Sequence, residues 1–124
     1  MWSYNIQSDY WEKMLNEGAP YGSYANFGTY FDEQKNELQI IHGKINANPA
    51  FPSEMLYWKY SFVTNNWEQL DAVNDPPGAS IIGLAFHPIL RKAILFGGIV
   101  KYEPKTLLEG TWVLDVDKME WSEY

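Results

Sequence analysis

Large apolar residues alternate with smaller or polar ones in three short segments of this 124-residue chain. They are Trp2, Tyr4 and Ile6, then Trp58, Tyr60 and Phe62, and finally Trp112, Leu114 and Val116. A period of two is typical of a β-strand that buries one face. In each segment a polar insert, rich in residues that favour turns, precedes a second tryptophan. We therefore predict that each segment is a hairpin leading into a further strand.

The six tryptophans form three pairs with a constant spacing of nine residues. The pairs are Trp2 and Trp11, Trp58 and Trp67, and Trp112 and Trp121, and they recur after 56 and then 54 residues. Pro20 and Gly22 match Pro76 and Gly78, and two more apolar runs follow each match, differing by one residue inserted in the turn between them. Each full period therefore predicts four short strands, which indicates a blade of a β-propeller. We expect the tryptophans to be mostly buried in or between blades.

The segment ILFGG, a loop and GTWVLDVDKMEW together resemble the kelch repeat, in which an apolar strand ends in Gly-Gly and a tryptophan opens the last strand. Gly97, Gly98 and Trp121 match this motif closely, while His42-Gly43 stands where Gly-Gly is usual in the earlier copy. The resemblance implies an all-β fold of kelch-type propeller blades, each a four-stranded antiparallel sheet. It says little about function, because such propellers serve as adaptors, scaffolds and enzymes.

The strand count predicts an incomplete ring within a single partial propeller that spans residues 1–124. Residues 1–14 supply half a blade, 22–70 a full blade and 78–124 a second one, which makes ten strands. Propellers close with about four to eight blades. The chain is then either part of a longer propeller or one of several copies that assemble into a ring. We favour the first alternative, because a half-blade in a self-assembled ring keeps an unpaired inner edge.

Composition and charge restrict the classes of function. Hydrophobic residues make up 46% and aromatic residues 17%, which suits a packed core. The net charge of −7 argues against a nucleic-acid partner. No apolar run is long enough for a membrane-spanning helix, and no signal peptide is visible. The absence of cysteine excludes disulfides and thiolate chemistry, and leaves the compartment open, with the cytoplasm favoured.

We find no catalytic or metal-binding motif in the sequence. The only histidines, His42 and His87, lack metal-ligand spacing, and without cysteine the copper site of some kelch-like oxidases cannot be built. Acidic residues such as Asp115 and Asp117 fall in turns or on solvated strand faces. The serines lack a nucleophile elbow, and Gly97-Gly98 lacks the residues of a phosphate-binding loop. We therefore expect no cofactor and no metal, and lean against an enzyme.

The loops are the remaining candidates for function, because rigid scaffolds usually place function on them. In kelch-like propellers the loops corresponding to residues 15–21, 44–54, 71–77 and 99–109 share one face of the ring. The candidate partner-binding residues on them are Tyr21, Lys44, Phe51, Asp75, Lys101, Tyr102 and Lys105. The alternative is that Phe51 and Leu107 only anchor their own loops to the blade and contact no partner.

The sequence thus leaves two functions open. The favoured one is a protein-binding or scaffold module that presents these loops to a protein partner. The alternative is that the chain supplies structural blades to a larger oxidase- or hydrolase-like propeller whose catalytic residues lie elsewhere.

Overall fold

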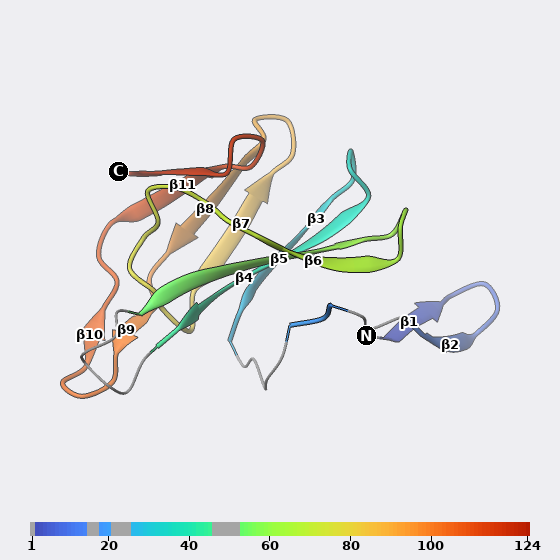
Figure 1. Cartoon of the computed structure of the whole chain (residues 1–124), viewed down its shortest axis with the longest axis horizontal. Coiled ribbons are helices and arrows are strands. Elements are labelled where there is room, and N and C mark those ends of the chain that lie inside the picture. The colour runs from blue at the N-terminus through green and yellow to red at the C-terminus, as the bar shows by residue number, and fades with distance from the viewer. Residues whose placement is uncertain (1, 15–17, 21–25, 46–52) are drawn as a thin grey trace.

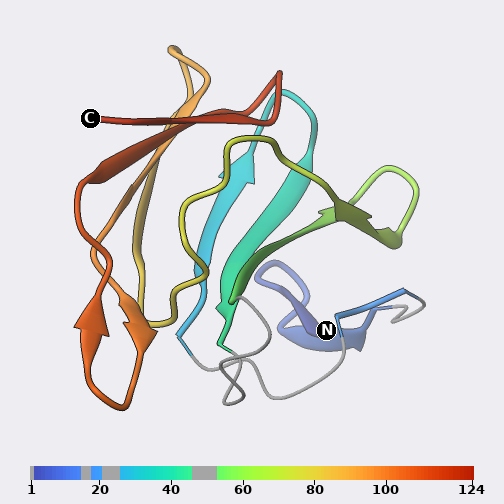
Figure 2. The same cartoon turned by 60° about the vertical axis from the view of Figure 1, so that its left-hand side comes forward.

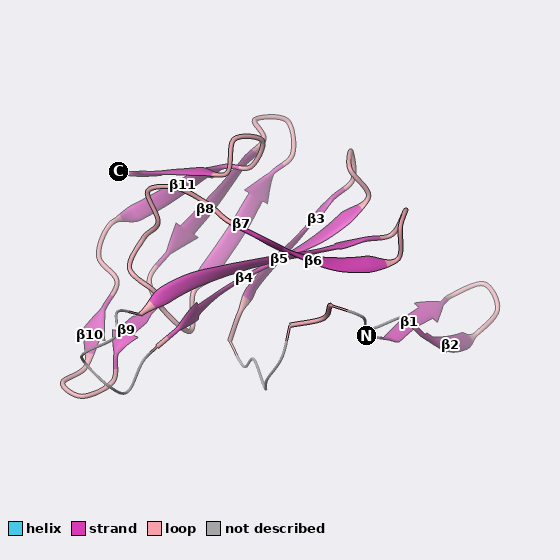
Figure 3. Ribbon diagram, viewed as in Figure 1, coloured by secondary structure: helices cyan, strands magenta, loops and turns pink. Residues whose placement is uncertain are grey.

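The computed structural model describes residues 2–14, 18–20, 26–45 and 53–124. These residues form strands and turns, and no helix occurs among them (Figure 3). The strands are β1 (Trp2–Asn5), β2 (Tyr10–Lys13), β3 (Gly28–Asp32), β4 (Glu37–Lys44), β5 (Glu54–Ser61), β6 (Asn66–Leu70), β7 (Gly83–His87), β8 (Lys92–Phe96), β9 (Ile99–Lys101), β10 (Thr106–Leu107), β11 (Thr111–Asp115) and β12 (Glu120–Glu123).

Two four-stranded antiparallel sheets form the body of the molecule (Figure 1). Their strand orders are β3-β4-β5-β6 and β12-β11-β8-β7, and the hairpins β1–β2 and β9–β10 are separate two-stranded sheets. The prediction of an all-β chain of antiparallel sheets is confirmed, and no sheet closes on itself. The described residues hold twelve strands rather than ten, because the predicted loop 99–109 contains β9 and β10. Lys101 pairs there with Thr106 and Ile99 with Leu107. Ile99, Val100 and Thr106 are β-branched residues, which favour extended structure.

Five hairpin turns share one backbone geometry. Each places four residues between the paired strand ends, and the last of the four has a positive φ. These left-handed residues are Asp9, Asn36, Asn65, Arg91 and Met119. The strand residue four positions earlier caps the turn, as where Asp32 Oδ1 accepts the Gln34 N–H at 3.1 Å. The turns 33–36 and 88–91 therefore have equal length, so the insertion that we expected between those strands is wrong, and the one-residue difference between the copies precedes the first strand.

The core lies between the two four-stranded sheets. Tyr30 on β3 stacks on Phe86 of β7 with ring centroids 4.4 Å apart, and Gly28 lies against Leu84. On β4, a Cβ added to Gly43 would lie 2.1 Å from the carbonyl oxygen of Ala79. Only glycine allows this approach of the chain that connects the sheets. The buried residues of this core cluster are Tyr30, Ile41, Met55, Tyr57, Ala79, Ala93, Leu95, Leu108, Leu114, Val116 and Trp121.

An ion-pair network joins three hairpin turns at one end of the two sheets. Arg91 donates to both carboxylate oxygens of Asp32 at 2.8 and 2.7 Å, and to Asp117 at 2.9 and 3.1 Å. Lys35 pairs with Asp117 at 3.0 Å. The hydrogen bonds from Arg91 hold the pKa of Asp32 and of Asp117 below the usual range for a carboxyl group. Asp32 is buried, so its pair with Arg91 is an inter-sheet contact rather than a surface pair, whereas Lys35 and Asp117 are exposed.

The expected burial of the tryptophans holds for the two sheets and is wrong for the first hairpin. Trp67 and Trp121 are buried, and Trp58 and Trp112 are partly buried. In contrast, Trp2 and Trp11 are 61% and 59% exposed. The hairpin β1–β2 that carries them projects beyond the four-stranded sheets and pairs with no other strand of the described chain (Figure 1). The aromatic side chains of this hairpin are therefore largely in water.

We expect Trp121→Ala to lower the free energy of unfolding by about 3–5 kcal/mol, because it empties a buried site. It also removes the hydrogen bond that Trp121 Nε1 donates to the Tyr57 hydroxyl at 2.8 Å. Trp11→Ala, at the same place in the repeat, should change the free energy of unfolding by less than about 0.5 kcal/mol. Urea titrations of both variants measure the difference, and a loss below about 1 kcal/mol for Trp121→Ala contradicts its placement in the core.

Arg91→Met should lower the free energy of unfolding by about 3 kcal/mol at pH 7, because it leaves Asp32 buried without its partner. Asp32 and Asp117 have a lower pKa in the folded chain than in the unfolded one. Their contribution is therefore complete above about pH 4 and is lost as the pH falls below that value.

Urea titrations between pH 7 and about pH 2.5 measure this loss. The free energy of unfolding of the wild type should fall toward that of Arg91→Met at the acid end of the range. Lys44→Gln is the control, because it breaks only the exposed Lys44–Glu54 pair. A difference between wild type and Arg91→Met that stays constant over the whole range contradicts this account of the network.

Candidate functional site

The connections between strands gather at the end of the sheets opposite the ion-pair network. The strands β4 and β8 run from the turns 33–36 and 88–91 toward this end, and β5 and β11 run back from it. The predicted loops 71–77 and 99–109 are fully described, whereas Tyr21 and Phe51 lie outside the described residues. The hairpin β9–β10 stands at this end in both views of the chain (Figures 1 and 2).

Two consecutive glycines set the direction of the β9–β10 hairpin. Gly97 and Gly98 have φ values of +67° and +124°, which favour glycine. A Cβ on Gly98 would also lie 3.0 Å from Cβ of Ala79, so the chain has little room there. Ser80 and Ile99 then exchange backbone hydrogen bonds of 2.8 and 3.0 Å. The Gly-Gly pair predicted at the end of a strand therefore docks the hairpin onto the connection between the two sheets.

Leu108, rather than Leu107, fixes this loop to the rest of the chain. Leu108 is buried in the core, and its N–H donates to the Gly98 carbonyl at 3.0 Å. Leu107 is 56% exposed. The alternative in which Leu107 only pins its loop is therefore wrong, because neighbouring residues of an extended chain point in opposite directions.

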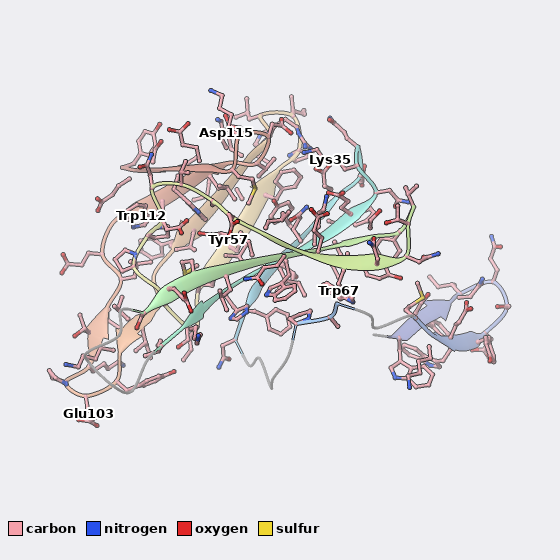
Figure 4. All side chains as sticks on the ribbon, in the orientation of Figure 1. Lys35, Tyr57, Trp67, Glu103, Trp112 and Asp115 are labelled. Atoms are coloured by element: carbon pink, nitrogen blue, oxygen red, sulfur yellow. The ribbon has the colours of Figure 1, made fainter. Side chains whose placement is uncertain are left out.

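An open groove of about 690 Å³ lies between the hairpin, the connection 71–82 and the strands β11 and β12. Its lining residues are Asp75, Pro77, Val100, Thr106, Leu107, Leu108, Glu109, Trp112 and Glu123. The indole of Trp112 is held in place because its Nε1 donates to the Glu109 carbonyl at 3.2 Å. In Figure 4 Trp112 lies on the body of the two sheets, as Tyr57 does, whereas Glu103 lies in the turn of the β9–β10 hairpin. The groove thus combines an apolar wall with three carboxylates.

Asp75 is held in the groove by a hydrogen-bonded chain that starts in the core. Trp121 Nε1 donates to the Tyr57 hydroxyl at 2.8 Å, and that hydroxyl donates to Asp75 Oδ1 at 2.6 Å. Burial raises the pKa of Tyr57 above its usual range, so the phenol keeps its proton. Burial also raises the pKa of Asp75, while the hydrogen bond from Tyr57 opposes that change and nearby Asp71 adds to it.

A second, smaller cleft of about 220 Å³ adjoins the first at Asp75. It lies along β5 and β6 and includes Glu54 and Asp71 among its lining residues. A third cleft of about 310 Å³ is lined by Glu12 and Lys13 of the first hairpin on one side and by Tyr60 and Asn65 on the other. Asp75 is the residue that the first two clefts share, and acidic side chains therefore continue from one cleft into the next.

The remaining predicted partner-binding residues stand outside the groove lining. Lys44 is exposed and pairs with Glu54 at 2.9 Å. The Tyr102 hydroxyl lies 2.8 Å from Ser80 Oγ, and Lys101 and Lys105 are exposed on the β9–β10 hairpin. Of the predicted residues that are described, only Asp75 lines the groove. The roles of all these residues in partner binding stay predictions.

Among the described residues, no group of three or more His, Asp or Glu side chains is placed to hold a metal ion. His42 is buried in β4, where burial lowers its pKa, and His87 Nδ1 accepts the Leu90 N–H at 3.2 Å in a turn. No helix of the described chain is long and apolar enough to cross a membrane.

The chain matches no family model and no curated protein. It superposes on the solved structure of YjhT with a TM-score of 0.66 over 93% of this chain, at 16% sequence identity. At that identity the likeness shows the fold alone. The chain spans 40% of the length of the YjhT chain.

Proposed function

We propose that the two four-stranded sheets are blades of an incomplete kelch-type propeller. Three observations support this assignment. Each sheet is antiparallel with its four strands in sequence order, the first strands β3 and β7 lie beside each other, and Gly97-Gly98 follows the second strand of the second sheet. The fold shared with YjhT over 40% of that chain is consistent with a part of a larger arrangement of sheets.

The sheet formed by β7, β8, β11 and β12 has an outer face that is suited to packing against a further sheet. Phe96 is 68% exposed, and Ile94 and Ala85 are exposed on the same face. Apolar side chains grouped on one sheet face mark a contact surface. In the proposed propeller this face packs against a further four-stranded sheet, as the two described sheets pack against each other.

Without that further sheet, the purified chain should bind a hydrophobic dye or self-associate through this face. Phe96→Glu should reduce both, whereas Ile89→Glu, which changes an exposed residue of a turn, should leave them unchanged. Sedimentation in dilute solution and dye fluorescence make the comparison. A stable monomer that binds no dye contradicts the uncovered face, and a discrete trimer favours a ring formed by copies of the chain.

For function, we propose a protein-binding module that engages its partner through the loops at one end of the blades. The observation that carries this proposal is the groove, in which the exposed Leu107 and the fixed indole of Trp112 border polar groups. An aromatic and aliphatic patch with a polar rim is the usual composition of a binding hot spot. Loops carried on a rigid sheet framework are the usual place for such a patch.

Selection of a random peptide library on the purified chain tests this function. Enriched peptides should lose binding by at least about tenfold on Leu107→Asp, because a charge replaces the apolar contact. Leu90→Asp is the matched control, since Leu90 is an exposed leucine in a turn at the opposite end of the sheets. Peptides that respond equally to the two variants, or to neither, contradict binding through the groove.

A further inference from the structure

The charged side chains on the rim of the groove are all acidic. Asp75, Glu109 and Glu123 come from three different segments, and neither lysine nor arginine lines the groove. The nearby lysines of the hairpin, Lys101 and Lys105, are absent from the lining. The ionisable groups that line the groove are therefore all carboxylates.

The segments that carry Glu109 and Glu123 are held by backbone contacts, and Asp75 is held by the hydroxyl of Tyr57. Gly110, with φ of +77°, lies so close to Glu123 that an added Cβ would be 2.7 Å from Oε1. Thr111 and Tyr124 exchange backbone hydrogen bonds of 3.2 and 2.8 Å, which hold the end of β12 beside the start of β11. The hydrogen bond from Trp112 to the Glu109 carbonyl fixes the backbone of the third segment. The backbone of these segments is therefore fixed beside the groove.

We propose that the groove binds a basic peptide segment, in which an arginine side chain faces the rim carboxylates and a neighbouring apolar side chain packs on Leu107 and Trp112. This inference rests on the proposed binding function and names the chemistry of the partner. Arginine suits the site better than lysine, because its planar group pairs with carboxylates in a bidentate manner and stacks on an indole. A volume of about 690 Å³ accommodates several side chains. The net charge of −7 attracts such a segment from a distance.

Four labelled peptides of one length separate charge from apolar contact: Arg-Leu-Arg, Arg-Ser-Arg, Gln-Leu-Gln and Glu-Leu-Glu, each flanked by glycine and serine. Fluorescence polarisation with the full chain should give an affinity for Arg-Leu-Arg at least about tenfold above that for the other three. The affinity should fall as salt rises, because the charges on the rim are partly exposed. Equal binding of Gln-Leu-Gln, or no binding of Arg-Leu-Arg up to about 1 mM, overturns the inference.

Charge reversal locates the effect. The double variant Glu109→Lys, Glu123→Lys should weaken Arg-Leu-Arg binding by at least about tenfold, while Glu33→Lys, in a turn at the opposite end, should change it less than about twofold. Equal losses overturn the inference, because they indicate attraction by the overall charge. A dimer that the double variant dissociates also overturns it, since a second copy would then occupy the groove.

The library selection distinguishes the two proposals. Enriched peptides that depend on Leu107 but carry no positive charge leave the binding function standing and overturn the basic partner. Enriched peptides that depend on Leu107 and contain arginine support both. The absence of any peptide that depends on Leu107 counts against both.

Discussion

The contact between Arg91 and Asp32 is the constraint on which the arrangement of the two sheets depends. It joins the first turn of one sheet to the first turn of the other, and Asp117 extends it to a third turn. These turns meet at one end of the two sheets. The strands that leave them run to the other end, where the connecting segments are therefore brought close to one another. The close approach of Gly43 to Ala79 then brings the connection between the sheets against β4. The groove is a consequence of this framework, since its walls come from segments that the framework brings together.

Burying Asp32 and placing Arg91 in a left-handed conformation are both unfavourable steps when taken alone. Three of the five equivalent turns have Asp or Asn at that position, whose side chains tolerate the conformation, whereas Arg91 and Met119 do not share this property. The bidentate ion pair offsets the local strain at Arg91 and the desolvation of Asp32 together. Replacing such a pair by apolar residues is often neutral for stability. Its physical advantage here is direction, because a guanidinium and a carboxylate align two turns in a way that apolar side chains do not.

The strands were predictable and the site was not. Alternating residues such as Trp112 and Leu114 carry the period of two, which is a local property of the chain. The tryptophan spacing alone predicts equal environments for Trp11 and Trp121, yet Trp121 is buried against Tyr57 of the other sheet and Trp11 is exposed. Burial depends on neighbours that the local pattern does not encode. The same limit applies to the groove, where the pinning residue is Leu108 and not Leu107. Asp75 was a candidate from its loop, but its link to Trp121 through Tyr57 joins residues far apart in the sequence.

That link also indicates how the core and the loops are coupled. Trp121 occupies a position that the repeat keeps, yet its indole N–H reaches Tyr57, and Tyr57 in turn positions Asp75 in the groove. The corresponding Trp67 makes no such bond, and its Nε1 has no acceptor among the described residues. The two tryptophans at equivalent positions of the repeat therefore contribute differently to the neighbouring loops. A repeat can keep its packing residues and still acquire a distinct binding surface, because one additional hydroxyl and one loop carboxylate convert a core residue into a support for the site.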